Sequence, residues 1–155
     1  MNPTSIVAWW GAILSTGVFA WDIYKYRSAG PKLRFTAQTG METVNAPFYE
    51  GKTLIVANVT NYGDRPTTIT TVAFEYFKGS RRWRKKKPDK AAVTLTPSVT
   101  QPLPFELKPG VVWTGLIIQN PEIEEWATTG ILDMLVYHSH TGKPLRQRIA
   151  IKKRK

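Results

Sequence analysis

The sequence predicts an all-β domain preceded by one apolar helix. Residues 1–21 carry no charged side chain, and residues 32–155 consist of short runs rich in β-branched and aromatic residues, separated by turns with Gly, Pro and Asn. We therefore expect a transmembrane helix over residues 1–25, a hinge over 26–31 and a β-sandwich domain over 32–155. About 120 residues follow the helix, which is enough for one compact domain and not for two.

The apolar segment predicts a membrane span. About 20 helical residues cross a hydrocarbon core of about 30 Å. Trp21 and Tyr24 suit the interface as aromatic anchors, and Lys25 and Arg27 supply the positive charge that collects on cytoplasmic flanks. We expect a single-pass protein of the bacterial inner membrane, with the N-terminus outside and the C-terminal domain cytoplasmic. A signal peptide, which would need a positive n-region, and a helix that lies on a partner are the alternatives.

Small residues recur along one face of the predicted helix. In lipid, such residues let two helices approach closely. The residues expected to pack against a second helix, from the same or another protein, are Ala8, Gly11, Ala12, Ser15, Thr16 and Ala20. The alternative is that short spans are simply rich in small residues.

The remaining sequence contains eight candidate strands. They are residues 32–39, 52–60, 67–77, 91–96, 103–107, 111–119, 131–138 and 145–151. Short strands with regular turn signals predict an antiparallel, immunoglobulin-like β-sandwich of seven to eight strands. A small closed barrel is the alternative architecture.

One short crossover helix interrupts these strands. Asn120 is suited to cap it, Pro121 fits its first turn, and Gly130 is expected to end it in a left-handed conformation. Negative charge at the start of a helix is favourable, and it comes from Glu122, Glu124 and Glu125. These carboxylates are therefore expected to cap and solvate the helix and not to act in catalysis.

Two phrases of the sequence carry a resemblance to a known group of proteins. Residues 53–70, TLIVANVTNYGDRPTTIT, look like a strand–turn–strand element, and residues 101–115, QPLPFELKPGVVWTG, resemble a later strand pair of the same modules. With the N-terminal apolar segment, the chain resembles small uncharacterised bacterial membrane proteins that have one transmembrane helix and an immunoglobulin-like domain. The resemblance implies a fold and no activity.

No catalytic signature is present in the sequence. The chain has no cysteine, no GxSxG motif and no Gly-rich phosphate loop. His138 and His140, with Asp133 nearby, suggest at most a weak metal site, and a polar hairpin turn is the favoured interpretation. The sequence thus predicts that the protein is not an enzyme and that it has no catalytic residue, no metal and no cofactor.

A basic loop is the second functional signal. Its residues, expected to bind a partner, are Arg81, Arg82, Trp83, Arg84, Lys85, Lys86 and Lys87. With a net charge of +11, the chain suits an acidic protein surface or nucleic acid at this loop, and membrane lipid at the helix. The alternative is a solvated loop, and a second basic patch is the tail, residues 152–155.

Together these features predict a non-enzymatic, membrane-anchored interaction or accessory subunit of a membrane protein complex. It would present a basic cytoplasmic sandwich to a membrane-protein partner, and self-association is a further option. Alternative functions are a membrane-tethered nucleic-acid-binding module and a periplasmic or surface binding domain.

Overall fold

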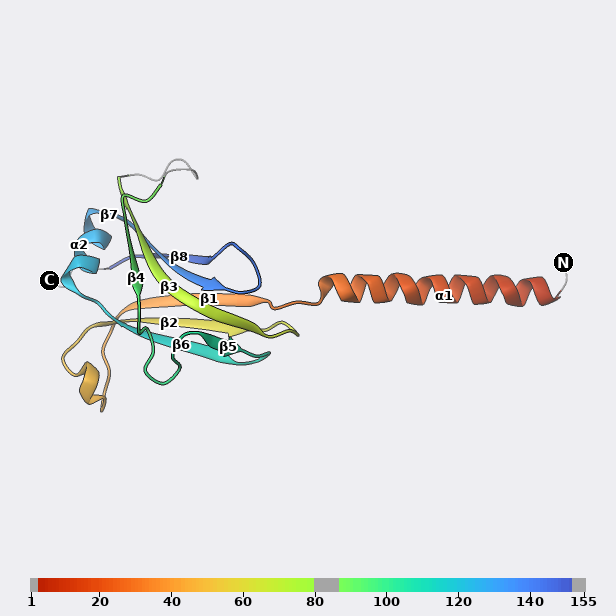
Figure 1. The fold of residues 1–155 in the computed structure, drawn as a ribbon, viewed down its shortest axis with the longest axis horizontal. Helices are drawn as coiled ribbons and strands as arrows, with labels where there is room; N and C mark the ends of the chain where they lie inside the picture. Colours follow the sequence, from red (N-terminus) through yellow and green to blue (C-terminus); the bar gives the residue numbers. More distant parts are fainter. Residues whose placement is uncertain (1–2, 80–86, 152–155) are drawn as a thin grey trace. The chain divides into compact units, whose positions relative to one another are not determined.

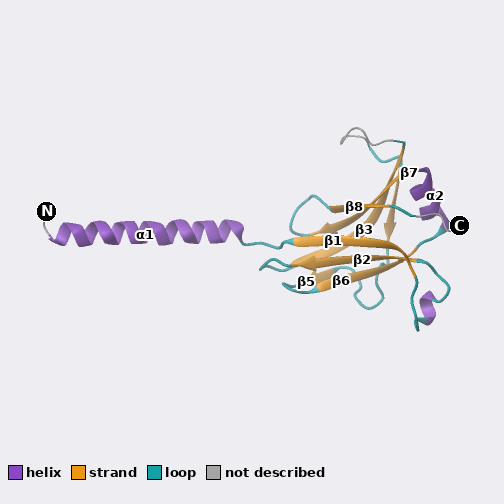
Figure 2. Ribbon diagram, turned by 180° about the vertical axis from the view of Figure 1, so that it is seen from behind, coloured by secondary structure: helices purple, strands orange, loops and turns teal. Residues whose placement is uncertain are grey.

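A computed structural model describes residues 3–79 and 87–151 of the chain, and for residues 3–6, 27 and 28 it describes the backbone alone. The chain divides into two compact units, Met1–Gly30 and Pro31–Lys155. The first unit is the helix α1 (Pro3–Ser28), and the second contains the strands and the helix α2 (Figures 1 and 2).

The structure corrects the prediction for the first unit. No helix among the described residues is long and apolar enough to cross a membrane. The predicted fold class is therefore wrong in its transmembrane helix, and so is the localisation as a single-pass inner-membrane protein. The apolar run contains tryptophan, glycine, serine and threonine, which add little hydropathy, and α1 continues beyond Trp21 through Asp22 and Lys25.

The second unit consists of two antiparallel sheets. The smaller sheet has the order β1 (Leu33–Met41), β2 (Leu54–Asn61) and β6 (Val112–Ile118). The larger sheet has the order β4 (Lys90–Thr94), β3 (Thr67–Lys78), β7 (Gly130–His138) and β8 (Leu145–Ile149), and β5 (Phe105–Leu107) also pairs with β3. The eight strands thus form two separate sheets and not the closed barrel considered as an alternative.

Alternate side chains of both sheets fill the space between them. Residues of β3 that are two apart face this core, as do those of β2 and β7, since side chains on a strand alternate between its two faces. The largest fully buried side chains in the core cluster include Trp113, Phe74, Ile55, Leu107 and Met134. Because these come from strands distant in the sequence, the core joins the two sheets.

The helix α2 (Pro121–Thr129) connects β6 of one sheet to β7 of the other. Asn120 caps it as predicted, because its Oδ1 accepts a hydrogen bond from Ile123 N at 2.9 Å. The predicted left-handed end is wrong: Gly130 has φ −160°, which is extended backbone. Glycine is needed there because a Cβ would meet the backbone oxygen of Phe77 and would lie 2.6 Å from the Tyr76 ring.

The segment between β4 and β5 crosses from one sheet to the other. β4 and β5 both pair with β3, at residues 72–76 and 67–69 respectively. Between them, Pro97 O accepts a hydrogen bond from Leu116 N of β6 at 2.6 Å. The crossing segment therefore joins the β4 edge of the larger sheet to the β6 edge of the smaller sheet.

Asn61 fastens two turns at one end of the sandwich. Its side chain is fully buried, and its Nδ2 donates to Arg65 O at 2.8 Å and to Leu107 O at 3.1 Å. Its backbone N donates to Val111 O and its O accepts from Gly110 N. One residue therefore joins the β2–β3 turn to the β5–β6 turn.

Candidate functional site

Most of the predicted partner loop lies outside the described residues. This applies to Arg81, Arg82, Trp83, Arg84, Lys85 and Lys86, and likewise to the basic tail, residues 152–155. Lys87 is described and is exposed. The roles predicted for the basic loop therefore stay predictions.

The small residues of α1 are all exposed. This holds for Ala8, Gly11, Ala12, Ser15, Thr16 and Ala20. The Ser15 hydroxyl donates to Gly11 O, and the Thr16 hydroxyl donates to Ala12 O at 2.8 Å, so the helix satisfies its own polar side chains. Packing against a second helix stays a prediction.

The predicted interface anchors lie on the last turns of α1. The rings of Trp21 and Tyr24 lie 5.9 Å apart, centroid to centroid, and Lys25 is exposed. The anchoring role predicted for these residues, with Arg27, depended on the membrane span that the structure contradicts.

The two histidines lie close together at the end of β7. Their rings are nearly parallel, with centroids 6.4 Å apart. Burial, and secondly the neighbouring His140, lower the pKa of His138 below its usual 6.5. The described residues include no group of three or more His, Cys, Asp or Glu that could hold a metal ion. Asp133 instead accepts a hydrogen bond from Arg146 at 3.0 Å.

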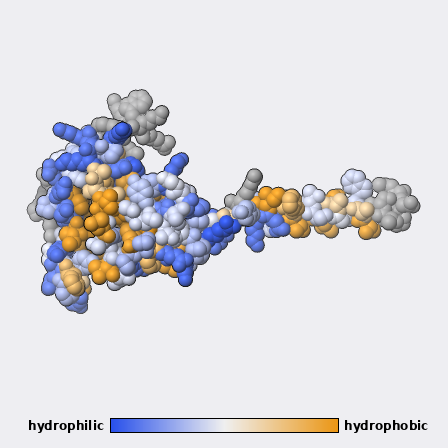
Figure 3. Space-filling view, in the orientation of Figure 1, coloured by the Kyte–Doolittle hydropathy of each residue, from blue (hydrophilic) through white to orange (hydrophobic). Residues whose placement is uncertain are grey.

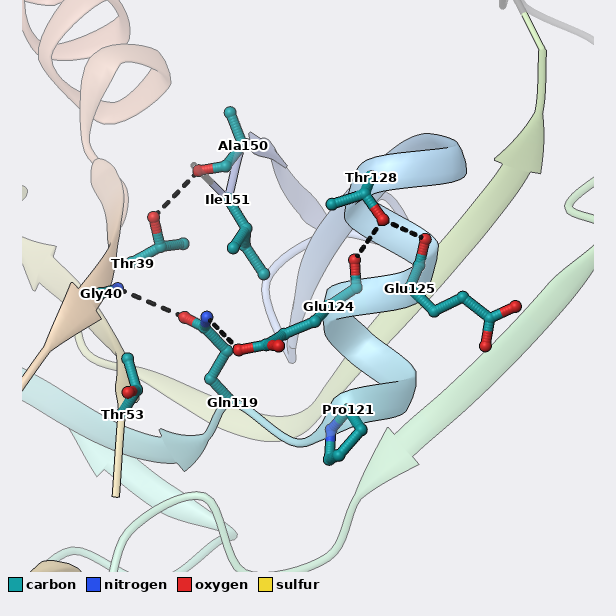
Figure 4. A pocket seen from close by; sticks show the side chains of 10 residues that line it. All are labelled: Thr39, Gly40, Thr53, Gln119, Pro121, Glu124, Glu125, Thr128, Ala150 and Ile151. Carbon is teal, nitrogen blue, oxygen red and sulfur yellow. Dashed lines mark hydrogen bonds between the residues drawn. The ribbon is translucent and has the colours of Figure 1, made fainter. Parts of the chain in front are cut away.

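A polar pocket of about 770 Å³ lies between the ends of β1 and β8 and the start of α2 (Figure 4). Gln119 Nε2 donates to Glu124 Oε1 at 2.9 Å, while Gln119 Oε1 accepts from Gly40 N at 3.3 Å. The Thr39 hydroxyl donates to Ala150 O at 2.9 Å. These groups hold the ends of the two sheets and α2 together, so the carboxylate that faces Gln119 serves structure.

A second, more apolar pocket is a groove between the two sheets. It has a volume of about 490 Å³ and opens where β4 and the end of β6 face each other. We call it the β4–β6 groove. Its described lining is Phe48, Tyr49, Lys52, Phe74, Ala92, Val93, Thr94, Thr96, Val99, Leu116, Ile117, Ile118, Asn120, Glu122, Ile123 and Trp126.

Large apolar side chains surround this groove and remain exposed. The exposed fraction is 82% for Phe48, 59% for Val93, 71% for Val99 and 41% for Ile118. Figure 3 shows a continuous area of apolar side chains on the face of the sandwich over β4. Contiguous exposed apolar surface of this kind commonly marks an interaction site.

Trp126 lines the groove and is itself almost fully buried. Its ring stacks on Tyr76 with the centroids 5.8 Å apart, and Lys90 Nζ lies 5.5 Å from its centroid. The Tyr76 hydroxyl and Thr129 Oγ1 are 3.0 Å apart and share a hydrogen bond, which fixes the Tyr76 ring against α2. An aromatic floor with a cation at its edge suits a ligand that is apolar and negatively charged.

Sequence reasoning missed this groove. The run at residues 91–96 predicts a strand, but nothing in the run shows which edge of a sheet it will occupy. All five residues of β4 are exposed or partly exposed. They are exposed because β4 lies at the edge of the larger sheet. That position is set by pairing with β3, which the run of residues 91–96 does not reveal by itself.

Comparisons with known proteins give no family for this chain. No protein-family model and no curated protein matches the sequence. Among solved structures, a β-glucosidase from Kluyveromyces marxianus matches with a TM-score of 0.27 and 16% identity, over 78% of this chain and 14% of the enzyme. The matched region is thus a small part of that enzyme, and the similarity supports no functional conclusion.

Proposed function

We propose that this chain is a non-enzymatic protein-binding module and that the β4–β6 groove is its contact surface. The observation that supports this most directly is the apolar rim of the groove. Phe48, Val93 and Val99 come from separate segments of the chain, and each is more than half exposed. Three unrelated segments that present apolar side chains around one opening favour recognition of a ligand there.

The lining of the groove favours an extended ligand. Residues of the strand β4, of the 3-10 helix η1 (Pro47–Tyr49) and of α2 all contribute to it. Aromatic side chains beside a strand are features of peptide-binding grooves. The ligand class that we propose is therefore a peptide segment of another protein.

Selection of peptides tests the proposal. A random peptide library is selected on the purified full chain, and the enriched peptides are titrated against two variants. Ile118→Asp places a carboxylate on the groove rim, and Tyr137→Asp makes the same change on β7 at a residue of similar exposure, 37% against 41%. We expect the groove variant to weaken binding by at least about tenfold and the control to leave it unchanged.

The proposal fails if the enriched peptides bind both variants equally well. It also fails if repeated selections enrich no peptide. Circular dichroism of each variant confirms that the sheets are retained, so that a loss of affinity reports on the groove.

A further inference from the structure

The edge strands of this domain differ in whether side chains cover their outward backbone groups. The outer edge of β1 is occupied by the Gln147 side chain, which accepts from Ala37 N at 2.7 Å and donates to Ala37 O at 3.1 Å. The outer edge of β6 is occupied by Gln101, which accepts from Thr114 N at 2.7 Å and donates to Val112 O at 3.1 Å. In both places an amide side chain takes the hydrogen bonds that another strand would take.

The outer edge of β4 has no such cover among the described residues. No hydrogen bond from a described side chain reaches residues 90–94, and their only described strand partner is β3. Exposed edge strands are uncommon because they invite another strand to pair, and proteins usually blunt them. An edge left open beside an apolar groove therefore favours the addition of a strand.

The pairing of β4 with β3 shows which N–H and C=O groups of β4 point away from the sheet. Tyr76 O accepts from Asp89 N at 2.8 Å, so the polar backbone groups of Tyr76 are directed at β4. Tyr76 pairs with Lys90, and hydrogen-bonding direction alternates along an antiparallel strand. The N–H and C=O groups of Ala91 and Val93 therefore point to the outer edge.

The charges near β4 indicate what the added strand carries. Lys87 and Lys90 are exposed at its beginning on either side of the exposed Asp89, and Lys52 and Glu122 line the groove. Among these residues the cations outnumber the carboxylates by three to two. The whole chain has a net charge of +11, so a second copy at this edge would be repelled. An acidic partner is attracted instead.

We infer that the outer edge of β4 takes up an extended acidic segment of a partner protein as an added strand of the larger sheet. This rests on the proposed function and makes it specific. Main-chain hydrogen bonds to Ala91 and Val93 hold the segment, and its alternate apolar side chains enter the β4–β6 groove. Its acidic side chains lie where the segment passes the start of β4, near Lys87 and Lys90.

Two short synthetic peptides test the charge of the segment. One alternates valine with glutamate and the other alternates valine with lysine, and each is titrated calorimetrically onto the full chain. We expect the glutamate peptide to bind at least about tenfold more tightly, with a preference that falls as salt is added. Equal binding, tighter binding of the lysine peptide, or no binding of the glutamate peptide overturns the inference.

Backbone hydrogen bonding is tested separately. N-methylation of every second residue of the glutamate peptide removes the N–H donors along one edge of the extended peptide. The two alternate methylation patterns remove the donors of opposite edges. We expect one pattern to reduce affinity at least about tenfold and the other to reduce it little. This experiment leaves the protein unchanged, so it does not depend on the folding of a variant.

A matched pair of protein variants completes the test. Val93→Pro removes the outward N–H, whereas Val93→Thr keeps it with a side chain of similar shape. We expect the proline variant to lose at least about tenfold in affinity and the threonine variant to retain binding. Peptide binding that survives Val93→Pro and both methylation patterns, yet is lost in Ile118→Asp, overturns strand addition and leaves the proposed function standing. A dimer in sedimentation that Val93→Pro abolishes would make a second copy the occupant and overturn the choice of an acidic partner.

Discussion

The Gln147 side chain forms two hydrogen bonds with the backbone of a single residue, Ala37. Its Oε1 accepts from Ala37 N at 2.7 Å, and its Nε2 donates to Ala37 O at 3.1 Å. The residue belongs to β8 of the larger sheet, and Ala37 belongs to β1 of the smaller one. One side chain thereby joins an edge of each sheet.

We expect Gln147→Ala to lower the free energy of unfolding by about 1–2 kcal/mol, because it leaves a partly buried N–H and C=O without their partner. The measurement is urea denaturation of the full chain. Arg148→Ala, at the exposed neighbouring position, is the control and should change stability by less than about 0.5 kcal/mol. Similar losses in the two variants would contradict a bridging role for the glutamine.

Arg146 connects two acidic side chains on the larger sheet. Its guanidinium donates to Asp133 Oδ2 at 3.0 Å and to Glu75 Oε2 at 2.7 Å, and Asp133 is buried. We expect Arg146→Met to destabilise the fold by about 2 kcal/mol, which is less than for a fully buried pair because Arg146 stays partly exposed. The stability of Arg146→Lys should fall between that of the unaltered chain and that of Arg146→Met, since lysine keeps the positive charge but cannot bond both carboxylates as the guanidinium does. Equal stability of the methionine and lysine variants in thermal unfolding would refute this.

Gly115 is required by the packing of β6. A Cβ at this position would lie 2.6 Å from Trp113 Cη2 and 3.2 Å from Pro97 O. We expect Gly115→Ala to lower the free energy of unfolding by about 1–3 kcal/mol through overpacking. Gly142→Ala, where a Cβ would meet nothing within 4 Å, is the matched control. A melting temperature for Gly115→Ala that equals that of the control would show that Trp113 can move aside.

The lowered pKa of His138 predicts a pH dependence of stability. Burial is the larger cause and His140 the smaller, and both favour the neutral ring in the folded chain. The unfolded chain therefore takes up the proton first as the pH falls, so this contribution is fully present above pH 6.5 and is lost as the pH falls toward the lowered pKa.

Melting temperatures on either side of pH 6.5 measure this effect. We expect His138→Gln to remove this part of the pH dependence and His140→Gln to reduce it only partly, because burial remains. An unchanged slope in His138→Gln would assign the dependence to other groups.

Local signals in the sequence predicted the strands and the start of α2. The Asn120 cap is an example, because its hydrogen bond to Ile123 N joins residues three apart. The groove and the covered edges could not be predicted, since Gln147 meets Ala37 and Gln101 meets Thr114 only after strands distant in the sequence have paired. The transmembrane prediction was wrong because it depended on the absence of charge, which is a weaker criterion than hydropathy.

Both ends of β2 are held by hydrogen bonds. At its last residue, Asn61 is bonded to both neighbouring turns. Just before its first residue, Thr53 O accepts from Gln119 N at 2.8 Å, and the Gln119 side chain is bonded in turn to Gly40 and Glu124. The β4–β6 groove therefore lies beside a fastened end of the sandwich. A partner would meet a preformed surface there, which lowers the entropic cost of binding.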